Sequence, residues 1–139
     1  MQPTTLCVPS GTADRTAAAS LPTCRARPCH LGLVRALDHL RTRAAAPVTL
    51  TELARVACLS KYHFLRTFTR AYGCSPHAYQ MQLRLALARA LVEAGEPLSS
   101  VAYSAGFADQ SHLTRRFKQA FGETPGAYAR RAKRARRAA

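Results

Sequence analysis

The fold of this chain is decided by residues 105–118, which read AGFADQSHLTRRFK. The pattern of residue types around this stretch also occurs earlier in the chain. ELARVACL at residues 52–59 matches SVAYSAGF at residues 100–107 with an offset of 48. Further on, His63-Phe64, Phe68, Gly73, Pro76 and Tyr79 match His112-Leu113, Phe117, Gly122, Pro125 and Tyr128 with an offset of 49. The chain therefore contains an internal repeat, with one extra residue in the second copy.

Each copy of the repeat has the pattern of a helix-turn-helix: a short helix with a small residue inside it, a tight turn, and a second helix with aromatic spacing. The small residues are Ala54 and Ala102. Alanine suits these positions because the second helix must cross close above the first. The turn favours glycine, which adopts positive φ without strain. Gly106 meets this requirement, whereas Cys58 in the first copy does not.

A packing helix is expected before the first copy. Its apolar residues recur at helical spacing from Leu31 onward, and Pro47 ends the segment. The predicted buried face consists of Leu33, Val34, Leu37 and Leu40. Thr49 and Glu52 have the spacing of a capping box, in which each side chain binds a free amide of the first helical turn. We expect a short helix over residues 50–57 after this cap.

Two longer helices follow in the predicted order. The second helix of the first copy is expected over residues 60–72, with Ser60 as its N-cap and Gly73 at its end. A linker helix is expected over residues 76–94, with a proline in its first turn. Its predicted apolar face consists of Tyr79, Leu83, Leu87, Ala90, Leu91 and Ala94. Its length of about 30 Å is close to one turn of B-DNA, about 34 Å, so one chain can place two reading helices in successive major grooves.

These elements predict an all-α fold of about seven helices, with two helix-turn-helix units joined by the linker helix. The predicted parts are a disordered segment at 1–29, a tandem helix-turn-helix domain at 30–130 and a basic tail at 131–139. Disorder is expected at the N-terminus because that segment lacks an apolar period. Within the domain, the predicted ranges are about 48–80 and 97–129 for the units, and 60–72 and 109–121 for the reading helices.

Composition limits the possible partners. The net charge of +14, from 21 basic and 7 acidic residues, favours a polyanion, which leaves nucleic acid and an anionic membrane as candidates. No apolar run of about 18 residues and no signal sequence is seen, so we expect neither a membrane span nor secretion. Five irregularly spaced cysteines indicate reduced thiols rather than a disulfide framework. Together with the repeat, these features predict a cytoplasmic protein that binds double-stranded DNA and no membrane.

Residues 31–130 resemble the DNA-binding domain of the AraC/XylS family of bacterial transcription regulators. The resemblance is most specific over residues 105–118 and the GETP sequence at 122–125, and residues 59–76 are also similar to the family pattern. It implies a sequence-specific regulator that reads two adjacent major grooves. The implied base contacts come from Tyr62, Leu65, Arg66, Gln110, Ser111, Thr114 and Arg115. The side chains expected toward the phosphates are Lys61, His63, Arg70, His112 and Lys118.

The chemistry of the implied base contacts differs between the two units. Arg66 and Arg115 can form bidentate hydrogen bonds to guanine, and Gln110 can do so to adenine. Leu65 offers only apolar contact, for example with a thymine methyl group. We therefore expect the first unit to read its half-site less strictly than the second.

Most members of the family join this domain to a larger sensor or dimerisation domain. The thirty residues before the predicted domain are too few for one, so we expect a stand-alone regulator of the MarA and SoxS type, or a shortened form of a longer regulator. Such a protein is expected to bind DNA as a monomer, to need no cofactor, and to be controlled by its amount. As an activator, it would have RNA polymerase as a further partner.

Two other functions compete with this interpretation. A nonspecific nucleic-acid binder is suggested by the basic residues of the tail, although a solvated disordered tail has the same composition. These residues are Arg130, Arg131, Lys133, Arg134, Arg136 and Arg137. A zinc module is suggested by Cys58, His63, Cys74 and His77, but the two cysteines lie at opposite ends of a predicted helix, about 20 Å apart.

Other chemistry finds little support in the sequence. A methyl-accepting cysteine of the Ada type within residues 7–29 would require a zinc domain far longer than this segment. No Gly-rich phosphate loop, paired carboxylates or Ser-His-Asp pattern is found. We therefore expect no enzymatic activity and no metal site.

Overall fold

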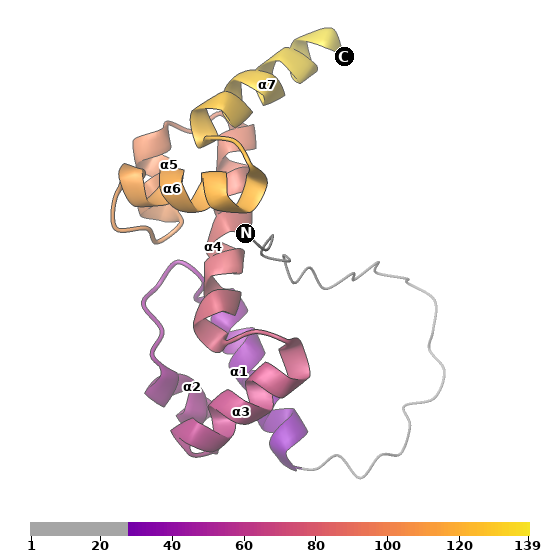
Figure 1. Cartoon of the computed structure of the whole chain (residues 1–139), viewed down its shortest axis with the longest axis vertical. Helices are drawn as coiled ribbons and strands as arrows, with labels where there is room; N and C mark the ends of the chain where they lie inside the picture. The colour runs from indigo at the N-terminus through magenta and orange to yellow at the C-terminus, as the bar shows by residue number, and fades with distance from the viewer. Residues whose placement is uncertain (1–27) are drawn as a thin grey trace.

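Seven helices follow one another along residues 28–139, the part of the chain that this computed structural model describes (Figure 1). They are α1 Pro28–Thr42, α2 Leu50–Val56, α3 Lys61–Tyr72, α4 Pro76–Ala94, α5 Leu98–Ser104, α6 Gln110–Phe121 and α7 Pro125–Ala138. No strand occurs within this part, so the predicted all-α fold of seven helices is confirmed. The predicted disordered segment lies outside the described residues, except that its last two residues begin α1.

Helices α3 and α6 begin and end in the same way. The hydroxyl of Ser60 accepts a hydrogen bond from the amide of His63 at 3.2 Å, and the carboxylate of Asp109 accepts one from the amide of His112 at 2.7 Å. Each helix ends at a left-handed glycine, Gly73 or Gly122. Glycine is favoured there because a side chain is strained at positive φ. The predicted ends of the first reading helix are thus confirmed.

Two separate hydrophobic cores hold the seven helices together. The first lies among α1, α2, α3 and the beginning of α4, and the second among the rest of α4, α5, α6 and α7. The buried residues from α1 are Leu33, Ala36, Leu37 and Leu40. Val34, which the sequence placed on this face, is 46% exposed because it lies beside the buried stripe rather than within it.

Helix α4 contributes to both cores with different faces. The prediction of one apolar face was wrong, since Leu87 is 36% exposed and Ala90 is also exposed. Near its beginning, α4 buries Tyr79 in the first core, and further along it buries Leu85 and Val92 in the second. The apolar pattern of α4 is therefore the sum of two patterns. A single apolar stripe at helical spacing does not distinguish the face in the first core from the face in the second.

The turns between the short and reading helices have the same backbone conformation in both units. Ala54 and Ala102 are each only 3% exposed, as the close crossing of two helices requires. Gly106 has φ of 79°, and Cys58 at the equivalent position has φ of 56°. Cys58 is the one residue other than glycine with positive φ among residues 28–139. The first turn therefore adopts the expected conformation with a residue that is strained in it.

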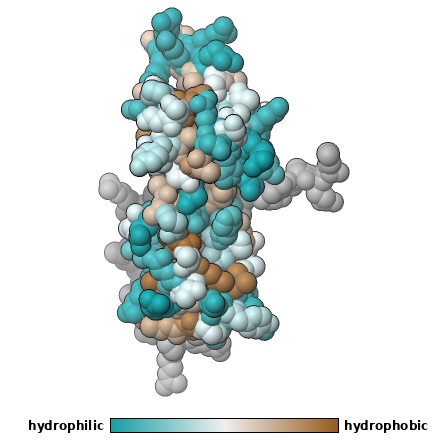
Figure 2. Space-filling view, turned by 90° about the vertical axis from the view of Figure 1, so that its left-hand side faces the viewer, coloured by the Kyte–Doolittle hydropathy of each residue, from teal (hydrophilic) through white to brown (hydrophobic). Residues whose placement is uncertain are grey.

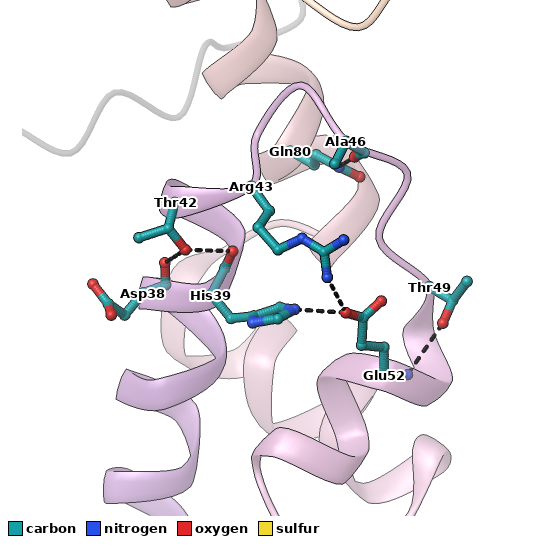
Figure 3. Close-up of polar contacts among 8 residues, drawn as sticks. All are labelled: Asp38, His39, Thr42, Arg43, Ala46, Thr49, Glu52 and Gln80. Carbon is teal, nitrogen blue, oxygen red and sulfur yellow. Dashed lines mark hydrogen bonds and ion pairs between the residues drawn. The ribbon is translucent and has the colours of Figure 1, made fainter.

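The carboxylate of Glu52 joins α2 to α1 (Figure 3). It accepts a hydrogen bond from His39 Nε2 at 2.8 Å and pairs with the guanidinium of Arg43 at 2.7 Å. The hydroxyl of Thr49 accepts a hydrogen bond from the Glu52 amide at 3.1 Å, as predicted for a capping box. These contacts, chiefly the hydrogen bond from His39, lower the pKa of Glu52 below its ordinary value of 4.5. Glu52 is therefore favoured in its charged form.

We predict that Glu52→Gln lowers the melting temperature at neutral pH, because the amide cannot form the ion pair. Folding lowers the pKa of Glu52, so its stabilising effect is complete above the unfolded value of 4.5 and is lost as the pH falls through the folded value. The gap in melting temperature between wild type and variant should therefore narrow below about pH 4. Thermal unfolding followed by circular dichroism measures this gap. A gap that stays constant into acid would contradict the prediction.

We predict that Cys58→Gly raises the free energy of unfolding by up to about 1 kcal/mol, because it relieves the strained left-handed residue. Gly106→Ala is the opposite change at the equivalent position. Its Cβ would lie 2.2 Å from the carbonyl oxygen of Ala45, at a φ of 79°. A destabilisation of about 2 kcal/mol or more is therefore expected. Denaturant unfolding measures both values, and a destabilised Cys58→Gly would mean that the greater freedom of glycine in the unfolded chain outweighs the relief of strain.

Candidate nucleic-acid interface

Helices α3 and α6 lie toward opposite ends of α4, in the lower and upper halves of the molecule (Figure 1). Each buries one face completely: Phe64 and Phe68 in α3, and Leu113 and Phe117 in α6, have no exposed surface. Because these residues lie four positions apart on one side of each helix, the positions on the opposite side face outward. The two helices therefore present equivalent outer faces, one from each unit.

The outer face of α3 carries all the side chains predicted to contact DNA from the first unit. Tyr62 is 71% exposed and Leu65 is 37% exposed, and Arg66 is also exposed. The guanidinium of Arg66 lies over the ring of Tyr62, 5.7 Å from its centre. The side chains predicted for phosphates are likewise exposed: Lys61, His63 and Arg70.

The outer face of α6 is less uniform. Gln110, Ser111 and Arg115 are exposed, as is Lys118 at the phosphate-facing position. Thr114 is half-buried, and its hydroxyl donates a hydrogen bond to the carbonyl of Gln110 at 2.8 Å. Its one donor is therefore occupied within the helix. What it offers outward is the methyl group and the hydroxyl oxygen as an acceptor.

The two equivalent histidines differ in their surroundings. His63 is exposed, whereas His112 is half-buried and packs edge-on against Phe107, with ring centres 5.4 Å apart. His112 therefore has a packing role in the second unit that His63 does not have in the first.

Sequence reasoning missed two basic residues beside these faces. His30 of α1 lines an open surface depression together with Tyr62, Arg66 and other α3 residues, although it lies far from them in the sequence. Arg116 follows Arg115 in α6 and is half-buried, and its Nε atom is buried without a hydrogen-bond partner among residues 28–139. The run of two arginines was a signal for Arg116, whereas nothing in the sequence pairs His30 with α3.

The charge of both reading helices is positive and uncompensated within each helix. Neither KYHFLRTFTRAY nor QSHLTRRFKQAF contains an acidic residue. Figure 2, which turns the left-hand side of Figure 1 toward the viewer, shows a mainly hydrophilic face with smaller hydrophobic patches in its upper and lower halves. Exposed basic and polar side chains without acidic neighbours on the same helix suit contact with phosphates and base edges.

The basic tail is the end of a helix. α7 continues to Ala138, so the structure places these residues in a helix. Arg131 is paired with Glu123, whose Oε1 accepts hydrogen bonds at 2.5 and 3.1 Å, and this raises the pKa of Arg131. Arg131 also lies 4.8 Å from the centre of the Tyr128 ring. Arg131 therefore already has partners within the protein, whereas the composition of the tail suggests that all its basic residues are free to bind phosphate.

The alternative zinc ligands do not gather into a site. Within residues 28–139, no three side chains of His, Cys, Asp or Glu lie close enough together to hold a metal ion. Cys58 and Cys74 are separated by the whole of α3, as the spacing argument expected. Also within this range, none of the helices has the length and apolar character needed to cross a membrane.

The fold and the two exposed helices define a tandem helix-turn-helix domain, and comparison with known proteins agrees. A family model described as a helix-turn-helix domain matches residues 53–131. The HTH-type transcriptional regulator YbfI of Bacillus subtilis (strain 168) is 39% identical over 76 residues, which cover 55% of this chain and 28% of that protein. The multiple antibiotic resistance protein MarA of Salmonella typhimurium is 31% identical over 93 residues, covering 66% of this chain and 73% of MarA.

Solved structures show the same fold. The DNA-binding domain of AdpA in complex with a target DNA has a TM-score of 0.63 and 30% identity, covering 79% of this chain and 96% of that one. An AraC-type regulator from Chromobacterium violaceum has a TM-score of 0.69 at 21% identity, covering 74% and 93% of the two chains. The chain belongs to the AraC/XylS family of transcription regulators, which confirms the resemblance. It spans less than a third of the length of YbfI.

Proposed function

We propose that this protein reads two adjacent major grooves of double-stranded DNA, with α3 in one groove and α6 in the next. The observation that carries this proposal is the placement of two equivalent, outward-facing basic helices toward the two ends of α4. With 19 residues, α4 is about 28 Å long, near the 34 Å or so between successive grooves on one side of the duplex. One copy of the chain then suffices, so we propose binding as a monomer.

The proposed roles follow the chemistry of the exposed side chains. Arg66 and Arg115 bond to guanine edges and Gln110 to an adenine edge, which gives these positions most of the specificity. Leu65 and the methyl group of Thr114 make apolar contacts, for which a thymine methyl is the natural partner. The remaining base contacts are assigned to Tyr62 and Ser111. The phosphate contacts are assigned to Lys61, His63, Arg70, His112 and Lys118.

Regulation is proposed to act through the amount of protein bound at the operator. Within residues 28–139, α3 and α6 are both folded and each has an exposed face. We therefore propose that this domain contacts DNA without the help of a ligand-binding unit. An activator that works in this way also contacts RNA polymerase, and it acts at the nucleoid in the cytoplasm.

Helix α7 is proposed to add sequence-independent affinity. Arg130, Arg134 and Arg137 are exposed and share one face of the helix, because they follow one another at four- and three-residue spacing. Arg130, Lys133 and Arg136 line a groove beside the end of α4, together with Glu93 and Glu96. Arg134 and Arg137, which do not line this groove, are therefore the proposed phosphate ligands, since arginine binds phosphate without reading the base sequence.

The test of groove reading starts with selection of bound duplexes from a random pool. We predict two half-sites per monomer, with centres about ten base pairs apart. A single short half-site would mean that only one unit reads DNA, and the two-groove proposal would fail.

The selected duplex then tests the reading residues. Arg115→Ala should weaken binding to it by about 1 to 3 kcal/mol and relax the preference at one position. Arg35→Ala is the matched control, because it removes the same charge from an exposed position on α1. It should weaken binding to selected and random DNA alike. If Arg115→Ala also weakened both equally, its base-reading role would be refuted.

We predict that replacing Arg134 and Arg137 by Gln weakens binding to all sequences alike. The plot of log affinity against log salt should become shallower by about 0.9 for each phosphate that the variant no longer neutralises. Arg131→Gln is the control, since its guanidinium is already paired with Glu123 and should change the slope less. Titrations at several salt concentrations measure the slopes. Equal changes in slope from Arg131→Gln and from Arg134→Gln or Arg137→Gln alone would contradict the assignment.

A further inference from the structure

The connection between α1 and α2 is fastened to the linker helix by two polar side chains. Gln80 Nε2 donates to the carbonyl of Ala46 at 2.8 Å (Figure 3). It also donates to the carbonyl of Ala44 at 3.3 Å. Arg84, one helical turn further along α4, donates from Nε to the Ala44 carbonyl at 2.9 Å and from a terminal nitrogen to the Ala46 carbonyl at 3.1 Å. The same two carbonyls therefore receive hydrogen bonds from both side chains.

These side chains are suited to holding the connection in place. Gln80 is only 5% exposed, and it is the one polar residue buried in the described part of the chain. Arg84 is half-buried, and burial lowers the pKa of its guanidinium. A buried polar or charged group is tolerated when its hydrogen bonds are made, and a guanidinium fork suits two acceptors at once. Removing the Arg84 donors would leave each of these two carbonyls with only its hydrogen bond from Gln80.

The same connection touches the second unit. A Cβ placed on Gly106 would lie 2.2 Å from the carbonyl oxygen of Ala45 and 2.8 Å from its carbonyl carbon, so the two backbones are in close contact. Gly106 lies in the turn just before α6. In Figure 1 the purple connection rises beside α4 toward the second unit. Ala45, which lies between Ala44 and Ala46, is thus the residue that contacts the turn before α6.

We propose that Arg84 and Gln80 are positioning residues that make the protein selective for the separation between its two half-sites. They hold the Ala44–Ala46 segment against α4, and this segment packs against the turn at Gly106. Helix α6 therefore keeps a fixed position relative to the first unit. The inference rests on the proposed reading of two grooves. Neither side chain needs to contact DNA. Their effect is on the coupling between two binding events rather than on either one.

The test compares duplexes that carry both selected half-sites at the preferred separation with duplexes that have one base pair inserted or removed between them. Duplexes with only one half-site are measured alongside. Arg84→Met retains an unbranched side chain of similar length without the donors, and Arg35→Met is the matched control for the removed charge. The measured quantity is the ratio of affinities at the preferred and altered separations.

For wild type and Arg35→Met we expect a strong preference for one separation. For Arg84→Met we expect that preference to fall on the order of tenfold, the size of an ordinary coupling between two sites. Its affinity for each single half-site should equal that of Arg35→Met. An unchanged preference would overturn the inference while leaving two-groove reading intact. A loss of affinity for single half-sites as large as that for the paired site would also overturn it.

Two further measurements keep these outcomes distinct. If wild-type protein binds one half-site as tightly as two, the proposed function itself fails, whatever the variants do. If Arg84→Met has lost its helical circular dichroism signal, Arg84→Lys takes its place, because it keeps the charge but cannot serve both carbonyls with a planar fork. A folded Arg84→Lys with the wild-type preference would overturn the inference.

Discussion

The structure depends on one constraint: α4 must complete two hydrophobic cores with two different faces. The beginning of α4 packs in the first core and the rest of it packs in the second. Helix α4 is therefore both the last helix of one unit and the first helix of the next. The repeat extends accordingly, with Leu37 and Leu85 in equivalent positions of α1 and α4. Tyr79 packs on Phe68 with ring centres 5.9 Å apart, as Tyr128 packs on Phe117 at 5.6 Å. A shared rigid helix sets the distance between the units.

Much of this architecture could be predicted from local signals. Helix ends were predictable because Ser60 and Gly73 satisfy or relieve the backbone by themselves, without help from tertiary contacts. The faces of α1 and α4 were predictable only in part, because burial depends on which neighbours a helix meets: Leu33, Leu37 and Leu40 are buried as predicted, and Val34 is not. Leu87 has the spacing of the predicted face yet is 36% exposed, because α4 packs into the second core with Leu85, Ala88 and Val92. Cys58 shows the converse: tertiary packing imposes a conformation that its own chemistry disfavours.

The candidate interface could be predicted only as far as exposure. A face opposite fully buried aromatic residues must point outward, so the outer positions of α3 and α6 followed from the repeat. The hydrogen bond from Thr114 to its own helix, the packing of His112 on Phe107 and the buried Nε of Arg116 did not follow. These features depend on rotamers and on neighbouring elements, neither of which spacing encodes. Contacts to individual bases remain predictions for the same reason.

The scarcity of acidic residues has a structural counterpart. Among residues 28–139, Glu52, Glu93 and Glu123 each bind basic side chains, and Asp109 caps α6. Glu93 also accepts a hydrogen bond from the Tyr128 hydroxyl, which is the main reason that its pKa is lowered. Most of the acidic side chains in this part of the chain therefore bind other side chains of the fold or cap a helix. The charge that stays uncompensated includes the basic side chains on the outer faces of α3 and α6, and such side chains attract a phosphate backbone.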